Sequence, residues 1–299
     1  MSSSSISITR QHPGIAARLG DYLELSKPRI SALVLATVVA SGLIATWGQP
    51  DPWALVKVVL GTALVAASAS ALNQWLEQSR DARMERTRLR PLPDGRLSGR
   101  EVLAWAGVTL ALGLAVLLIS FSWPTTLAAG LTWLLYVWVY TPLKTRTSLN
   151  TAVGAVAGAL PVWIGWLAVG GAWDVRALAL YAIVFLWQFP HFMAIAWIYR
   201  QDYARAGMRM ASVVDASGAA GGRQAVLAAL TLLPVSFIPG LTTSAPLYLL
   251  AALVLGAGQA ACALAFFARR DDRSARRLLR ASILYLPLLL GMMVLIPLL

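Results

Sequence analysis

Residues 73–93 read NQWLEQSRDARMERTRLRPLP, and this stretch decides where the chemistry of the chain is concentrated. It follows residues 60–72, a run of apolar and small side chains without a charge. Three polar residues then recur at every fourth position, namely Asn73, Glu77 and Asp81. Because residues four apart lie on the same side of a helix, this spacing predicts one polar face at the end of a hydrophobic helix.

Arginines follow the polar face directly, at positions Arg83, Arg86, Arg88 and Arg90. Pro91 and Pro93 come next, and we expect them to end the helix. Mg²⁺ prefers oxygen ligands and keeps substrate phosphates in its shell, and guanidinium groups bind phosphate oxygens. The stretch therefore has the groups that a magnesium–diphosphate needs. Two simpler readings remain open: a helix end that enters water, and arginines that only set membrane topology.

The composition excludes an ordinary soluble domain. Of 299 residues, 58% are hydrophobic and 13% are charged, which indicates an integral membrane protein. The one cysteine, Cys262, excludes disulfides and cysteine metal sites. The net charge of +12 could suggest nucleic acid, but its distribution favours membrane topology, so we expect no nucleic-acid partner. Residues 1–20 lack an apolar segment and are interpreted as a polar cytosolic tail.

Hydrophobic segments long enough to span a bilayer, about 20 residues each, recur nine times. We expect a single all-α membrane domain over residues 21–299, with the lipid bilayer as its surroundings. The predicted spans are 28–47, 53–76, 102–121, 124–142, 149–169, 177–199, 223–241, 246–268 and 281–299.

The basic residues predict an orientation. With these nine spans, all of the 25 lysines and arginines except Lys57 and Arg176 fall on one side. By the positive-inside rule, the N-terminus is cytosolic and the C-terminus is extracytoplasmic. We expect a multi-pass protein of a bacterial inner membrane.

A second acidic position is expected beyond the sixth span. We predict that this helix continues through WIYRQDYARAGMRM (197–210), which places Tyr199 and Asp202 near its cytosolic end. Asp202 is a candidate second metal ligand, or an interfacial acid that pairs with Arg205. Lys144, which follows Tyr140, is a further candidate phosphate ligand, with the topological reading again open.

His191 is one of only two histidines and stands beside a proline in LWQFPHFMAIAW (186–197). A lone histidine inside a helix is often structural, with its ring bonded to a carbonyl. The alternatives are a proton donor or an axial ligand to haem iron. Along a continuous helix His191 would lie roughly 16 Å deeper than Asp202.

Four blocks resemble the UbiA superfamily of intramembrane prenyltransferases, and among them its haem-farnesylating branch. They are the opening stretch, YTPLKTRTSLN (140–150), GALPVWIGW (158–166) and WQFPHFMAIAWIYRQDYARAGMRM (187–210). The resemblance covers about residues 20–299. The chain departs from the resemblance in two places: Gln201 stands where relatives often carry an acid, and Ala211 and Ser212 stand where they often carry Leu-Pro.

The resemblance implies nine helices around a central cavity that opens near the cytosolic side. It implies Mg²⁺ as cofactor, farnesyl diphosphate and haem B as substrates, haem O as product, and haem A synthase as a partner, and it leaves the oligomeric state open. By matching positions it implies four metal-binding catalytic residues, which are Asn73, Glu77, Asp81 and Asp202. The implied diphosphate ligands are Arg86, Arg90, Lys144 and Arg146. Tyr140 and Tyr199 are implied as supporting residues, and His191 as the haem-binding histidine.

Three other functions compete with this one. A UbiA-type enzyme that acts on an aromatic quinone precursor is the nearest, and it would not need His191. A transporter would carry its ionisable residues near the membrane midplane, whereas here they gather at one end. A membrane scaffold without catalysis would leave residues 73–93 unexplained.

Overall fold

The computed structural model describes residues 14–243 and 245–296, and these residues form helices and connecting turns without a strand. Within this part of the chain, nine helical stretches are long and apolar enough to cross a membrane, as the sequence predicts. They are α2 (Pro28–Ala45), α3 (Pro52–Asp81), α4 (Gly99–Ser120), α5–η1–α6 (Trp123–Leu134, Leu135–Tyr140 and Thr141–Leu143), α7–α8 (Asn150–Ala159 and Pro161–Ala168), α9 (Val175–Ile198), α12 (Ala219–Thr243), α13 (Pro246–Arg269) and α14 (Asp272–Leu295).

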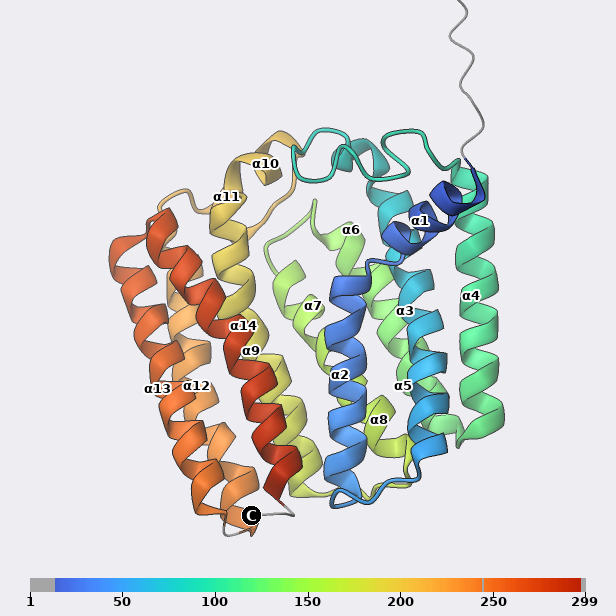
Figure 1. Ribbon diagram of the computed structural model, residues 1–299. Coiled ribbons are helices and arrows are strands. Elements are labelled where there is room, and N and C mark those ends of the chain that lie inside the picture. Colours follow the sequence, from blue (N-terminus) through green and yellow to red (C-terminus); the bar gives the residue numbers. More distant parts are fainter. Residues whose placement is uncertain (1–13, 244, 297–299) are drawn as a thin grey trace, which may run out of the picture.

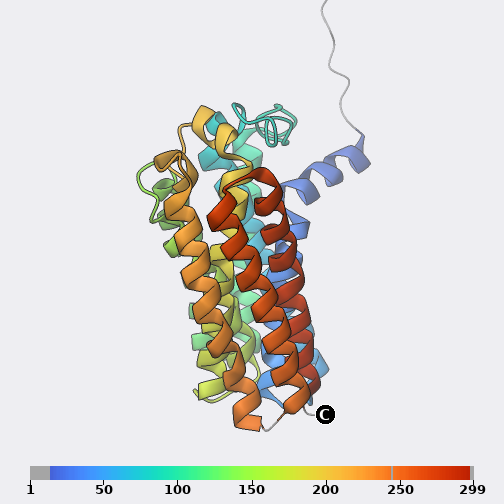
Figure 2. The same cartoon turned by 90° about the vertical axis from the view of Figure 1, so that its left-hand side faces the viewer.

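The spans stand side by side and run up and down the molecule (Figures 1 and 2). Three short helices, α1 (Ile15–Leu25), α10 (Arg200–Arg205) and α11 (Ala211–Val214), lie at one end together with the α3–α4 loop. This end, at the top of Figure 1, receives the arginine-rich loops and is called the basic end below. The last described residues lie at the opposite end.

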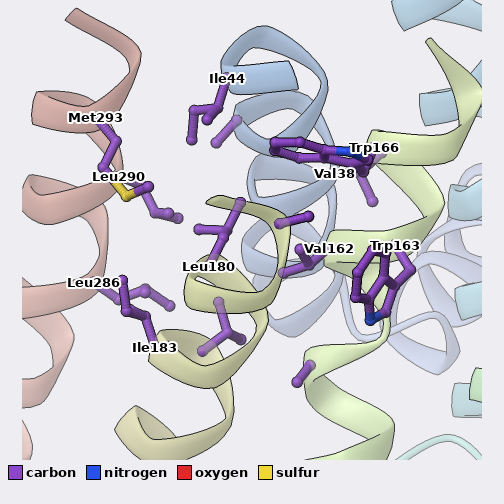
Figure 3. Packing of buried hydrophobic residues seen from close by; sticks show 14 of the residues in the cluster. Val38, Ile44, Val162, Trp163, Trp166, Leu180, Ile183, Leu286, Leu290 and Met293 are labelled. Carbon is purple, nitrogen blue, oxygen red and sulfur yellow. The ribbon is translucent and has the colours of Figure 1, made fainter. Parts of the chain in front are cut away.

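The largest cluster of buried hydrophobic residues lies in the half of the bundle that is remote from the basic end, and three smaller clusters lie nearer the basic end. Figure 3 shows part of this largest cluster, in which Val38, Trp163, Trp166, Leu180, Ile183, Leu286 and Leu290 from α2, α8, α9 and α14 pack together. Leucines on the outer faces of the spans, such as Leu112, Leu118 and Leu250, are instead more than half exposed, as expected for side chains in contact with lipid. The polar residues of the opening stretch lie outside this largest cluster, at the basic end.

Polar side chains cap the N-termini of several long helices, at the points where a turn is followed by an apolar run. The Asp51 carboxylate accepts from the Trp53 N–H at 2.9 Å and is followed by a proline in the first turn of α3. Ser98 and Glu101 form a reciprocal capping box at the start of α4. Asp174 accepts two backbone N–H groups at the start of α9. These caps fix where α3, α4 and α9 begin.

Two predicted helix ends are wrong. Helix α3 ends at Asp81 rather than at the prolines ten positions later, because the Thr87 hydroxyl donates to the Asp81 carbonyl at 2.8 Å and turns the chain back. The arginines from Arg83 to Arg90 thus lie in a folded loop, not on a helix. Helix α9 ends at Ile198, and Tyr199, with φ −103° and ψ 21°, separates it from α10. The depth of His191 relative to Asp202, which was estimated from a continuous helix, stays a prediction.

Helix α1 was not predicted. It includes the last residues of the segment interpreted as a polar tail, and Arg18 on it forms an ion pair with Glu101 of α4. Residues 1–13 lie outside the described residues. The division into a tail (1–20) and one membrane domain (21–299) stays a prediction.

We expect Gly165→Ala to destabilise the bundle. A Cβ at Gly165 of α8 would overlap the Val38 carbonyl oxygen and the Ser41 hydroxyl of α2. Forced overpacking of this kind costs about 1–3 kcal/mol, which thermal unfolding in detergent would measure. Gly107→Ala is the control, because nothing lies within 4 Å of a Cβ there. Equal melting temperatures for the two variants would contradict the close approach of α2 and α8.

Candidate active site

The polar face predicted from the opening stretch is present and buried. Asn73, Glu77 and Asp81 line the last two turns of α3, and each is at most 3% exposed. The Asn73 side-chain amide donates to Glu77 Oε2 at 3.1 Å and to Thr141 Oγ1 at 3.0 Å. Buried carboxylates are costly unless they are paired, so their partners reveal what this face does.

Each polar residue of this face contacts a different cation. Lys144 Nζ lies 2.9 Å from Glu77 Oε1, and Arg90 Nη1 lies 2.7 Å from Asp81 Oδ2. The Lys27 ammonium donates to Asn73 Oδ1 at 2.6 Å. The three cations come from the α1–α2 junction, the α3–α4 loop and the end of α6, so distant segments of the chain converge on one face.

Lys144 is positioned by an irregular stretch of the fourth span. Residues 135–140 form a π-helix, a rare conformation that is frequent at functional sites. The Thr141 hydroxyl donates to the Tyr136 carbonyl at 2.8 Å while accepting from Asn73. Lys144 Nζ lies 4.6 Å from the centre of the Tyr140 ring. Burial lowers the pKa of Lys144, but the Glu77 carboxylate and the tyrosine hydroxyls raise it above its ordinary value, so the ammonium keeps its charge.

The sequence analysis missed Lys27. This residue has φ 49°, in the left-handed region, between α1 and α2, and the turn points its side chain at the polar face. Burial, together with repulsion from Arg90 and Lys144, lowers the pKa of Lys27 to about 7. The sequence contained one indication of this contact. Lys27 directly precedes the proline that starts the first span, and this places it at the same end of the bundle as Asn73.

The second acidic position lies on α10. Asp202 is buried and pairs with Arg205, the alternative that its spacing had suggested. In the part of the chain that the structure describes, no hydrogen bond or ion pair joins Asp202 to the α3 face. The α9–α12 connection is nevertheless tied to the site, because the Arg209 N–H donates to the Lys144 carbonyl at 2.6 Å.

Arg86 and Arg146 are the remaining predicted phosphate ligands, and their surroundings differ. The Arg86 guanidinium lies 5.0 Å from the centre of the Tyr199 ring, which links the α3–α4 loop to the end of α9. Met84 packs beside it against Tyr203. Arg146 is exposed, and no hydrogen bond or ion pair of its side chain occurs among the described residues. Arg90 and Lys144 thus contact the α3 face directly, Arg86 contacts Tyr199, and the role of Arg146 stays a prediction.

The α3 face fits a hard divalent cation. Among the described residues there is no cluster of three or more His, Cys, Asp or Glu that could hold a metal alone. However, Asp81 Oδ1 is buried without a hydrogen-bond partner in that part of the chain. Mg²⁺ binds through one or two carboxylates and completes its shell with water and substrate phosphate. The oxygens of Asn73, Glu77 and Asp81 match this donor set.

His191 lies on α9, one turn from Trp187, and both side chains contact α14. Its Nδ1 is 2.9 Å from the Ser282 hydroxyl, and its ring stacks on Trp187 with 5.0 Å between centroids. The partner of the ring is a hydroxyl rather than the expected carbonyl, and this contact is compatible with a structural role as well as with a functional one. The ring is half-buried.

Comparison with known proteins identifies the family of the chain. The model of the UbiA prenyltransferase family matches residues 34–286. A protein named "Protoheme IX farnesyltransferase" from Solibacter usitatus is 40% identical over 289 residues, covering 92% of this chain and 98% of the relative. One of the same name from Koribacter versatilis is 39% identical over 306 residues, covering 99% of both.

A solved structure shares the fold at low sequence identity. The UbiA homologue from Archaeoglobus fulgidus, bound to GPP and Mg²⁺, superposes with a TM-score of 0.64 at 17% identity, covering 91% of this chain and 99% of the homologue. Family model, full-length relatives and fold agree on one conclusion: this chain is a membrane-embedded member of the UbiA prenyltransferase family.

Proposed function

We propose that this chain transfers the farnesyl group of farnesyl diphosphate to a vinyl group of haem B, with addition of water, to give haem O and diphosphate. The observation that carries the proposal is the buried α3 face of Asn73, Glu77 and Asp81, surrounded by three cations. The name shared by relatives at 39–40% identity supports the choice of donor and acceptor.

The donor would bind at the α3 face. Glu77 and Asp81, with Asn73 and Asp202, would hold Mg²⁺, which when bound supplies positive charge to the departing diphosphate. Lys144, Arg90 and Lys27 already lie at the same oxygens, so they are placed to bind phosphate oxygens beside the metal. Arg86, held over Tyr199, and Arg146 are proposed as further phosphate ligands, and Tyr140 and Tyr199 as supporting residues that position Lys144 and Arg86.

The acceptor would bind deeper in the bundle, where His191 is proposed to contact the haem. In the reaction the bond between farnesyl C1 and the diphosphate oxygen breaks, and a bond forms between C1 and the terminal vinyl carbon. Water adds to the carbon that has lost its electrons and releases a proton, which leaves a hydroxyethylfarnesyl arm. A site enclosed by helices protects the electrophilic C1 from premature attack by water.

We further propose that the basic end faces the cytosol of a bacterial cell, with the N-terminus on that side and the C-terminus on the other. The distribution of lysines and arginines over the nine spans supports this orientation. A haem A synthase is proposed as the partner that would receive haem O.

Removal of the metal tests the donor half of the proposal. With haem B and farnesyl diphosphate present, we expect chelation by EDTA to stop diphosphate release from the purified protein, and added Mg²⁺ to restore it. Omitting haem B, with Mg²⁺ present, is the control and should leave release at a low level. Full turnover after chelation would contradict the role of the α3 face. Equal turnover when an aromatic quinone precursor replaces haem B would favour the alternative acceptor.

A further inference from the structure

Two residues that lie 91 positions apart in the sequence meet in the middle of the bundle. His191 of α9 and Ser282 of α14 are joined by a 2.9 Å contact between imidazole Nδ1 and the serine hydroxyl. A neutral imidazole carries its proton on one nitrogen and a lone pair on the other, and the partner of each nitrogen decides which form is present. The contact to Ser282 therefore determines what His191 offers at its other nitrogen.

The proton of Ser282 is already engaged. Its hydroxyl donates to the Leu279 carbonyl at 2.7 Å, within the same helix. A hydroxyl has one proton to donate, so toward His191 the serine oxygen acts as the acceptor. In this arrangement the imidazole carries its proton on Nδ1 and its lone pair on Nε2. In the part of the chain that the structure describes, Nε2 has no hydrogen-bond partner.

The orientation of the ring is fixed by the same serine. The Trp187 indole N–H donates to the Ser282 backbone carbonyl at 2.6 Å, and the Trp187 ring stacks on His191 at an interplanar angle of 25°. Two side chains one turn apart on α9 are thus fastened to one residue of α14. Phe192 meets the imidazole edge-on, with 5.8 Å between centroids. These contacts restrict both the tilt and the rotation of the ring.

We propose that Ser282 is a positioning residue that keeps His191 protonated on Nδ1 and so presents the Nε2 lone pair to the iron of an incoming porphyrin. The inference rests on the proposed function for the identity of the acceptor. Imidazoles that bind metals are usually oriented in this way, by an acceptor on the nitrogen that does not bind. An imidazole lone pair is also the usual protein ligand of haem iron. Ser282 itself does not touch the haem.

The tautomer can be tested without haem. The chain has only two histidines, so a His12→Gln variant labelled with ¹⁵N-histidine gives the signals of His191 alone. We expect the wild-type ring at position 191 to be neutral with its proton on Nδ1. In Ser282→Ala an Nδ1 proton would be left buried without an acceptor, so we expect the proton to move to Nε2. A proton on Nε2 before the substitution, or a tautomer unchanged by it, would overturn the proposal.

Haem binding gives the second readout. We expect titration with haemin to produce a histidine-ligated Soret spectrum that His191→Ala abolishes. In Ser282→Ala the affinity should fall about 10- to 100-fold, as is typical when a group that orients a metal ligand is removed. Ser274→Ala is the matched control: Ser274 also lies on α14 and its hydroxyl also donates to a carbonyl three residues earlier, but it contacts no histidine. Equal affinities of the wild type and Ser282→Ala would overturn the proposal.

The two readouts separate this inference from the proposed function. In one outcome, Nδ1 carries the proton and Ser282→Ala moves it, but the wild type neither binds haemin nor forms a farnesylated haem. The proposed acceptor is then wrong, and haem iron is not the target of Nε2. If the wild type farnesylates haem while Ser282→Ala changes neither tautomer nor affinity, the proposed function stands and the role of Ser282 is wrong. Comparable melting temperatures of the Ser274→Ala and Ser282→Ala variants would show that a loss of fold does not cause the difference.

Discussion

Asp81→Asn is expected to lower the turnover number for farnesyl transfer about 10²- to 10³-fold, the range seen when one electrostatic contact to a developing charge is lost. Asparagine keeps the size of the side chain and one carbonyl oxygen. It removes the negative charge that holds Arg90 at 2.7 Å and the second carboxylate oxygen, Oδ1, which is buried without a partner. Both the metal and the nearby cation would therefore be held less firmly.

The control for this variant is Asp94→Asn. Asp94 lies on the same α3–α4 loop but is exposed, and it pairs with Arg96 rather than with a residue of the site. We expect it to keep wild-type turnover. Diphosphate release should be measured for both variants at saturating Mg²⁺ and haem. Wild-type activity in Asp81→Asn would contradict the assignment of the α3 face as the metal site.

Lys144→Met is expected to reduce the stability of the protein and to abolish activity. Its ammonium neutralises Glu77, and both side chains are largely buried, at 13% and 5% exposure. Breaking a buried ion pair on one side leaves an uncompensated charge and costs about 3–5 kcal/mol. The double variant Glu77→Gln/Lys144→Met removes both charges, so we expect it to recover most of the stability while remaining inactive.

This comparison separates stability from catalysis. Thermal unfolding in detergent gives the stability, and diphosphate release gives the activity. An exposed ion pair serves as the control: Arg200 and Asp272 are also in contact, but removing the charge of Arg200 should cost less than about 1 kcal/mol. Activity recovered in the double variant would show that Glu77 and Lys144 only stabilise the fold.

The spans and the polar face were predictable because each depends on local sequence. An apolar run of about 20 residues spans a bilayer whatever its neighbours are, which is why the nine spans were predicted correctly. Asn73, Glu77 and Asp81 share a face because helix geometry brings every fourth residue to the same side. Four blocks of the sequence then indicated the UbiA prenyltransferase family, and the match of the family model confirms that family.

The features that were not predicted depend on contacts between distant residues. The hydrogen bond from the Thr87 hydroxyl to the Asp81 carbonyl turns the chain at the end of α3, although the sequence up to the prolines is compatible with a continued helix. Lys27 reaches Asn73 across 46 positions through a left-handed turn. The pairing of His191 with Ser282 spans 91 positions and leaves no trace in either local sequence. No pattern within a window of one or two helical turns records such contacts.

The most direct test of the proposed function follows the fate of the haem. The purified protein is incubated with haem B, farnesyl diphosphate and Mg²⁺ in ¹⁸O-labelled water, and the extracted pigment is analysed by mass spectrometry. We predict a haem that has gained one farnesyl group and one hydroxyl group, with ¹⁸O in the hydroxyl. Haem recovered unchanged, while an aromatic quinone precursor supplied in the same reaction gains the farnesyl group, would contradict the proposal and assign a different acceptor to this site.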